Sequence, residues 1–175
     1  MPDSDVLPKR TIELDPDGID APPRAAFVEL GLVSCFNFLR GASDAVDLVL
    51  TARSLGYDAI GIADANSLAG VVRVHTEAKT LKMRPVIGCR IETVEGLAFL
   101  AYPQDRAAYG RLTTLISAGR MGKLDGSWQD KGVCDISLAM LAEHGEGVQL
   151  VLIPPCDLRE EFTVPGWASN VIALD

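Results

Sequence analysis

Apolar residues along the chain fall into short runs that alternate with amphipathic stretches. Runs at 27–33, 59–63 and 86–91 have the length and composition of buried strands in a parallel sheet. Between them, residues 43–55 and 68–80 carry apolar side chains at helical spacing. The resulting β-α-β-α-β order predicts an α/β fold of parallel strands joined by crossover helices.

The two predicted helices have recognisable ends and faces. We expect Ser43 to cap the first helix and Gly56 to end it. Asp44 and Asp47 then fall in its first turn, where the helix dipole stabilises negative charge. The second helix is expected to place these residues on its apolar face: Leu68, Val71, Val72, His75 and Ala78.

The second half of the chain predicts a hairpin, further helices and further strands. The hairpin pairs the third strand with the apolar run at 96–102 through a turn at Glu95-Gly96. Helices are expected at 105–120 and 136–143, with strands at 148–153 and, as a possible last strand, 170–174.

Composition divides the chain into three parts. Residues 1–26 hold five prolines and six acidic residues, which is typical of a leader without a core of its own. Residues 27–155 contain the regular apolar pattern and are predicted to form one α/β domain. Residues 156–175 form a tail that departs from that pattern.

The overall composition, 48% hydrophobic and 23% charged over 175 residues, is that of a globular protein. No stretch approaches the roughly 20 apolar residues of a membrane span, and the N-terminus lacks the pattern of a signal peptide. We therefore expect a cytoplasmic protein without a membrane partner.

A net charge of −8 disfavours binding of nucleic acid by electrostatics alone. One basic stretch is the exception, made of Arg106, Arg111, Arg120 and Lys123. Such a stretch is either a footprint for DNA or, more commonly, a solvated helix face. We favour the second interpretation, so that DNA is contacted only indirectly.

Familiar catalytic and metal-binding motifs are missing from the sequence. It contains no G-x-S-x-G, P-loop, G-x-G-x-x-G or H-E-x-x-H motif. The four cysteines form no C-x-x-C pair and are expected to be small buried hydrophobes: Cys35, Cys89, Cys134 and Cys156. Functional groups should therefore be sought at the carboxyl ends of the parallel strands.

Three blocks of sequence occur there in order: F-V-E-L-G-L-V-S-C-F-N-F-L-R-G-A-S, G-Y-D-A-I-G-I-A-D-A-N-S-L-A-G-V-V-R-V-H and V-I-G-C-R-I-E. Together they resemble the start of the PHP (polymerase and histidinol phosphatase) domain of bacterial C-family DNA polymerases. Two later segments, A-Y-P-Q-D-R-A-A-Y-G-R-L-T-T-L-I-S-A-G-R and L-A-E-H-G-E-G-V-Q-L-V-L-I-P-P, resemble its error-prone branch.

The resemblance implies a metal site whose ligands have been replaced. Metal-competent members carry H-x-H after the first strand, a D-H pair after the second and an acid after the third. The matching positions here are Gly31 and Val33, then Asp64 and Ala65, then Arg90. Arginine opposes a divalent cation by charge repulsion and is a candidate partner for Asp64. No metal is expected, although family members bind Zn, Mn or Mg.

Two functions remain open on this sequence. The first is a non-catalytic structural or protein-interaction module in DNA replication and repair, with polymerase domains or damage-response polymerase partners as its partners. The second is a metal-dependent phosphoesterase or 3′–5′ exonuclease with a reduced site formed by Glu29, Asp64 and Glu92. The family enzyme would be a DNA-directed DNA polymerase, and this chain alone is expected not to be an enzyme.

The resemblance also implies a distorted (β/α) barrel that is partial or truncated here. The family barrel has seven strands, and residues up to 155 supply about four of them. We expect the open edge to be covered, for example by oligomer formation. The chain is either a piece of a longer polymerase or a free-standing paralogue, and its numbering from Met1 favours the second.

Overall fold

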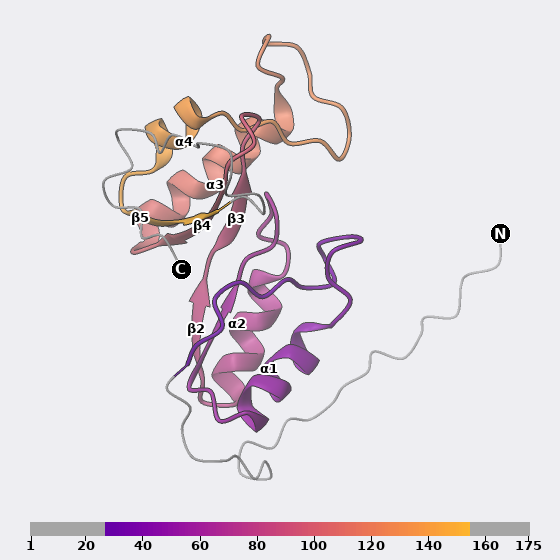
Figure 1. The fold of residues 1–175 in the computed structure, drawn as a ribbon, viewed down its shortest axis with the longest axis vertical. Coiled ribbons are helices and arrows are strands. Elements are labelled where there is room, and N and C mark those ends of the chain that lie inside the picture. Colours follow the sequence, from indigo (N-terminus) through magenta and orange to yellow (C-terminus); the bar gives the residue numbers. More distant parts are fainter. Residues whose placement is uncertain (1–26, 155–175) are drawn as a thin grey trace, which may run out of the picture.

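The computed structural model describes residues 27–154, which fold into four helices and five strands (Figure 1). The predicted leader 1–26, the tail 156–175 and the possible strand at 170–174 lie outside these residues. The elements follow in this order: α1 (Ala45–Ser54), β1 (Ala59–Ile62), α2 (Val71–Thr80), β2 (Arg84–Ile87), β3 (Cys89–Glu92), β4 (Ala98–Pro103), α3 (Arg106–Met121), α4 (Leu138–His144) and β5 (Val148–Ile153).

The first half of the domain is a parallel β1–β2 pair covered by α1 and α2 (Figure 1). Ala59 lies opposite Arg84, and the pairing continues to Ile62 opposite Ile87. Residues of both helices and of β1 share one buried cluster, which contains Ala45, Val49, Ala52, Ile60, Ile62, Val71, Val74 and Ala78. The predicted crossover connections are therefore present in this half.

The predicted strand at 27–33 is wrong as a regular strand, although the segment runs along the free edge of β1. Gly61 N donates to Glu29 O at 2.8 Å, and Ala63 N donates to Leu32 O at 2.7 Å. From the first bond to the second, the chain advances three residues in the 27–33 segment but only two in β1. The register therefore breaks between the two bonds. The Glu29 carboxylate then accepts from Gly31 N at 2.7 Å and fills the gap.

The predicted strand at 86–91 is also interrupted, because the chain changes sheets at Gly88. β2 pairs with β1, whereas β3 pairs with β4. A Cβ atom at Gly88 would lie 2.4 Å from Tyr102 Cδ1 and 2.6 Å from Ala101 O. Only glycine allows the backbone to pass so close to β4.

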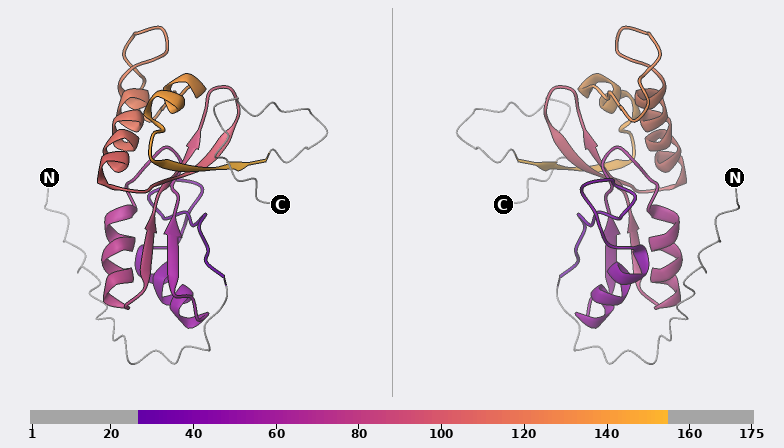
Figure 2. Two further views of the ribbon diagram at one scale, coloured as in Figure 1. Left: turned by 90° about the vertical axis from the view of Figure 1, so that its left-hand side faces the viewer. Right: turned by 90° about the vertical axis from the view of Figure 1, so that its right-hand side faces the viewer.

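The second half of the domain is antiparallel, so the prediction of parallel strands joined by crossover helices holds only for the first half. Its sheet has the order β3-β4-β5, with antiparallel pairing on both sides of β4. The hairpin between β3 and β4 turns through Gly96 at φ +86°, as predicted. α3 and α4 pack against this sheet, and the segment between them projects from the molecule (Figures 1 and 2).

A small third cluster joins the two halves. It contains Ala63 at the end of β1, Leu100 and Tyr102 of β4, and Val151 of β5. The Tyr102 hydroxyl donates to Leu30 O, which ties β4 to the irregular first segment. Burial raises the pKa of Tyr102 far above its usual value, so that the hydroxyl stays protonated and available as a donor.

Three details of the helices differ from the sequence predictions. Asp44, not Ser43, caps α1, because its carboxylate accepts from Ala45 N. Val72 is 72% exposed and His75 is exposed, because α2 buries the stripe of Val71, Val74 and Ala78 listed above.

None of the helices in residues 27–154 is long and apolar enough to cross a membrane.

Candidate functional site

Asp64 lies two residues after the end of β1 and is buried, with 1% of its surface exposed. Its Oδ1 accepts from Ser34 N at 2.7 Å. Its Oδ2 accepts from Ser34 Oγ at 2.8 Å and from Gly70 N, at the start of α2, at 3.2 Å. The carboxylate therefore holds the first loop and the second helix together, and both oxygens are occupied by protein donors.

The space around this carboxylate is filled. A Cβ atom at Gly70 would lie 2.6 Å from Asp64 Oδ2 and 2.5 Å from Ser34 Oγ. A Cβ atom at Gly41 would lie 2.1 Å from Ser34 O. Ser34 itself is fully buried. The packing leaves no room for an additional ligand at Asp64 unless Ser34 moves.

Arg90 does not pair with the Asp64 carboxylate as expected. Its backbone N donates to Asp64 O at 3.1 Å, while its side-chain Nε lies 3.0 Å from Glu92 Oε1. Arg40 Nη1 reaches the same carboxylate oxygen. The hydrogen bond from Arg40 holds the pKa of Glu92 below its usual value, and Glu92 in turn raises the pKa of Arg40.

Asn66 fixes this ion triplet, formed by Arg40, Arg90 and Glu92, relative to the end of β1. Its side chain accepts from Glu92 N at 2.9 Å and donates to Glu92 O at 3.2 Å. Its carbonyl accepts two bonds from the Arg120 guanidinium, at 2.8 and 3.2 Å. The residue has a left-handed backbone, φ +45°, which asparagine tolerates better than most residues.

The other positions where the family resemblance places metal ligands carry no lone pair on a side chain. Gly31 is exposed, and its N–H is taken by Glu29. Val33 and Ala65 are half-buried, and Ala65 forms a parallel bridge with Arg90.

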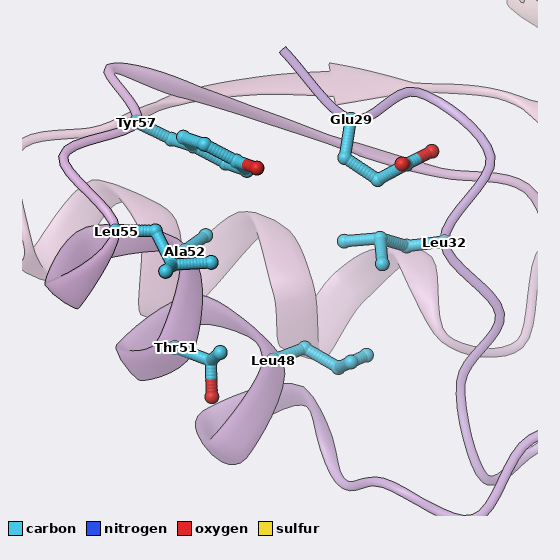
Figure 3. Close-up of a pocket in the computed structure, with 7 residues that line it drawn as sticks. All are labelled: Glu29, Leu32, Leu48, Thr51, Ala52, Leu55 and Tyr57. Carbon is cyan, nitrogen blue, oxygen red and sulfur yellow. The ribbon is translucent and has the colours of Figure 1, made fainter. Parts of the chain in front are cut away.

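Glu29, a candidate in the catalytic alternative, points into a different place. It lines a pocket of about 170 Å³ against α1, together with Leu32, Leu48, Thr51, Ala52, Leu55 and Tyr57 (Figure 3). Asp64 and Glu92 do not line this pocket. In a regular strand Glu29 would share a face with Gly31 and Val33, but this segment is not a regular strand.

The three carboxylates of the alternative site thus have separate partners. Glu29 accepts from Gly31, and Asp64 accepts from Ser34 and Gly70. Glu92 pairs with Arg40 and Arg90. Within residues 27–154, no group of three or more His, Cys, Asp or Glu side chains could hold a metal ion. A divalent metal requires several convergent N or O ligands. The described side chains do not fit that requirement.

The four basic residues of the predicted footprint do not share partners. Arg111 donates to Glu146 O, Arg120 to Asn66 O, and Lys123 Nζ lies 2.9 Å from Asp130 Oδ2. Arg106 and Arg120 stand at opposite ends of α3, about 21 Å apart at 1.5 Å per residue. The four residues thus have separate partners. Arg120 is linked to the ion triplet through Asn66.

The described cysteines differ from one another in exposure. Cys89 is buried, and burial raises the pKa of its thiol to about 12, so it is a poor nucleophile. Cys134 is half-buried, whereas Cys35 is exposed, which corrects the expectation of burial for this residue. Cys156 lies outside the described residues.

Residues 29–166 match the PHP domain family. The chain belongs to this family. Its PHP domain is 44% identical over 135 residues to the error-prone DNA polymerase of Allorhizobium ampelinum and 43% identical over 137 residues to that of Caulobacter vibrioides. The similarity covers 77% and 78% of this chain and 12% of each polymerase, so the chain spans only a small part of these relatives. The predicted relation to error-prone polymerases is confirmed.

A solved structure supports the same fold at lower sequence identity. A putative metal-dependent phosphoesterase from Bifidobacterium adolescentis superimposes with a TM-score of 0.58 at 15% identity. The match covers 80% of this chain and 72% of that one. It confirms a mixed α/β fold of the PHP type and carries no statement about activity.

Three residues of the site were missed by reasoning from sequence. Ser34 and Arg40 lie in the loop after the irregular first segment, and Asn66 lies two residues after Asp64. Their partners are 30, 52 and 26 residues away along the chain. Local pattern carries no signal for contacts at such separations.

Proposed function

We propose that this PHP domain does not hydrolyse phosphate esters and serves as a structural or protein-interaction module in error-prone DNA synthesis. The observation that carries the proposal is the state of Asp64, whose two oxygens accept three hydrogen bonds from Ser34 and Gly70. These bonds take three of the roughly four acceptor sites of a carboxylate, which leaves at most one electron pair, on Oδ1, for a metal or a substrate.

The cations beside the strand ends support the same conclusion. Arg90 and Arg40 place two positive charges on Glu92, in a region whose carboxylates are Glu92 and Asp64. A divalent cation placed there would be repelled by both guanidinium groups. The proposal therefore includes the absence of a resident Zn, Mn or Mg ion.

The partners we propose are polymerase domains or other proteins of the damage response. The error-prone polymerases named above carry the matching segment as about one eighth of their length. In them, this domain is linked to a much larger protein body. A docking role for the isolated chain extends that arrangement, and any effect on DNA follows through the partner.

We also propose that the fold is an incomplete distorted (β/α) barrel. The parallel β1–β2 pair, with residues 29–32 on the free edge of β1, supports this assignment. Among the described strands, β2 and β5 each pair on one side only. A partner chain or a second copy would cover such an edge.

Metal content and hydrolytic activity test the proposed function. The full chain would be dialysed with Mn²⁺ or Zn²⁺, separated from free metal, and assayed for bound metal and for hydrolysis of p-nitrophenyl phosphate and a 3′-labelled oligonucleotide. We expect substoichiometric metal and no hydrolysis above the buffer rate.

Stoichiometric metal that is lost in Asp64→Ala would overturn the proposal. Because Asp64→Ala also removes structural hydrogen bonds, Glu92→Gln serves as a second variant that leaves these bonds intact. Metal-dependent hydrolysis that either variant abolishes would establish the reduced-site phosphoesterase instead.

A further inference from the structure

We propose that residues 36–40, together with Arg90, form a docking surface for an acidic and apolar segment of a protein partner. This inference rests on the proposed interaction role and names the surface and the chemistry of what it binds. We refer to residues 36–40 as the 36–40 loop.

The 36–40 loop exposes large apolar side chains at the carboxyl edge of the parallel pair. Phe38 is 83% exposed, Leu39 is 90% exposed and Phe36 is 42% exposed. Apolar groups of this size, adjacent to one another and unprotected from water, are typical of surfaces that a partner covers. Burying a Phe or Leu side chain against a partner would stabilise the complex.

The loop is held in this conformation rather than collapsed onto the core. Its ends are closed by hydrogen bonds from Cys35 N to Ser43 O and from Gly41 N to Asn37 O, both 3.0 Å. Leu39 adopts φ +66°, a left-handed backbone that is unfavourable for leucine. A strained residue that remains almost fully exposed is a sign of a preorganised binding loop.

The rim of this surface is cationic. Arg40 and Arg90 share Glu92 Oε1, so their guanidinium groups lie close together, and each has further N–H donors. These donors have no other partner among residues 27–154. Arg73 lies with its guanidinium carbon 5.2 Å from the centre of the Phe36 ring, and its Nη1 pairs with Asp44 Oδ2 at 3.4 Å. The free donors of Arg40 and Arg90 are of the kind that binds carboxylates well, often in pairs.

A polypeptide fits this surface better than a nucleic acid. The net charge of −8 disfavours a phosphate backbone, whereas a short peptide carries only a few charges. Single-stranded nucleic acid binds through stacking on flat rings. The most exposed apolar residue here is Leu39, which cannot stack but can fill an apolar pocket.

Selection of peptides on the full chain tests the inference. A phage library of random dodecapeptides would be selected against the immobilised protein, and the enriched peptides measured by fluorescence anisotropy. We expect enrichment of sequences that combine Asp or Glu with Leu, Phe or Trp. The pair Phe38→Ser and Leu39→Ser, and separately the pair Arg40→Gln and Arg90→Gln, should each weaken binding at least about tenfold.

Two matched controls come from the opposite edge of the parallel pair. Leu55→Ser removes an apolar side chain that is 52% exposed, at the far end of α1 from the loop. Arg84→Gln removes an exposed cation at the start of β2. Both should bind the selected peptides like the wild type, and far-UV circular dichroism should verify folding in all variants.

The outcomes separate this inference from the proposed function. Peptides without acidic residues, binding that survives both pairs of loop substitutions, or binding of oligo(dT) in place of peptides would each overturn the docking surface alone. Metal-dependent hydrolysis in the assay above would overturn the proposed function, whatever the peptides do.

Discussion

Asp64 is the central residue of the candidate site. Its structural role can be measured as a change in the free energy of unfolding. Asp64→Asn replaces one acceptor oxygen by an amide NH₂, which cannot accept from the Ser34 or Gly70 N–H groups. One buried donor is then left without a partner, at a cost of about 2 kcal/mol. We expect the free energy of unfolding in urea, followed by circular dichroism, to fall by that amount.

Asp125→Asn is the matched control for this substitution. Asp125 also accepts from the backbone and hydroxyl of a serine, Ser127, at 2.9 and 2.7 Å, but on the surface. Water replaces those bonds when the acceptor is lost, so the free energy of unfolding should fall much less than for Asp64→Asn. Equal losses for the two variants would contradict a special structural role for Asp64.

At this scale the sequence predicted which positions lie at the strand ends but not what they contact. Asp64, Arg90 and Glu92 lie near the ends of their strands, and Arg90 and Glu92 do share a face. Asp64 and Glu92 each have one partner in the 34–43 segment, which contains Leu39 in a left-handed backbone. Leucine gives no sign of such a conformation in a sequence.

Gly88 decides how the elements are arranged, because it lets one run of apolar residues serve two sheets. Gly88→Ala would place a Cβ atom 2.4 Å from Tyr102 Cδ1 and 2.6 Å from Ala101 O. Since a backbone oxygen cannot rotate away, β3 or β4 must shift, and we expect a loss of at least about 2 kcal/mol. Chemical denaturation would measure it.

Gly110→Ala is the control on the same scale. Gly110 lies inside α3, where an added Cβ atom meets nothing within 4 Å. Alanine is the better helix former by about 0.8–1.0 kcal/mol, so this variant should be more stable than the wild type. If Gly110→Ala were also destabilised, the lower stability of Gly88→Ala would follow from replacing any glycine, and not from the close approach of β4 to Gly88.

The elements themselves were largely predictable, and the exceptions have physical reasons. α1, α3, α4, β1, β4 and β5 lie within a few residues of their predicted positions. The run at 86–91 reads as one strand because its pattern of apolar residues does not change where the sheet does. Antiparallel pairing of β4 with β5 depends on contacts some 50 residues apart, which periodicity does not encode.

For the whole molecule, the joint between the two halves is the feature to probe. Tyr102→Phe removes the hydroxyl that donates to Leu30 O and keeps the ring in the joining cluster. We expect a loss of about 1 kcal/mol, concentrated in the first segment. Hydrogen exchange should quicken at the Gly61 and Ala63 amides, whose acceptors lie in that segment.

An amide in α3, such as that of Leu112, provides the internal reference for this experiment. Leu112 belongs to the cluster of the antiparallel half. Tyr102 and Leu30 belong to the joining cluster instead. Its exchange should be unchanged in Tyr102→Phe. Uniform acceleration across Gly61, Ala63 and Leu112 would mean that the hydroxyl stabilises the fold globally rather than the joint.

The hydrogen bonds of Asp64 also bear on how such a domain changes over evolutionary time. In a domain that has lost its chemistry, as we propose for this one, a former site residue is normally free to change. Here the aspartate contributes to folding through Ser34 and Gly70, independently of any neighbouring ligand. Purifying selection for stability is sufficient to retain it, so an acidic residue at this position does not by itself reveal an active enzyme.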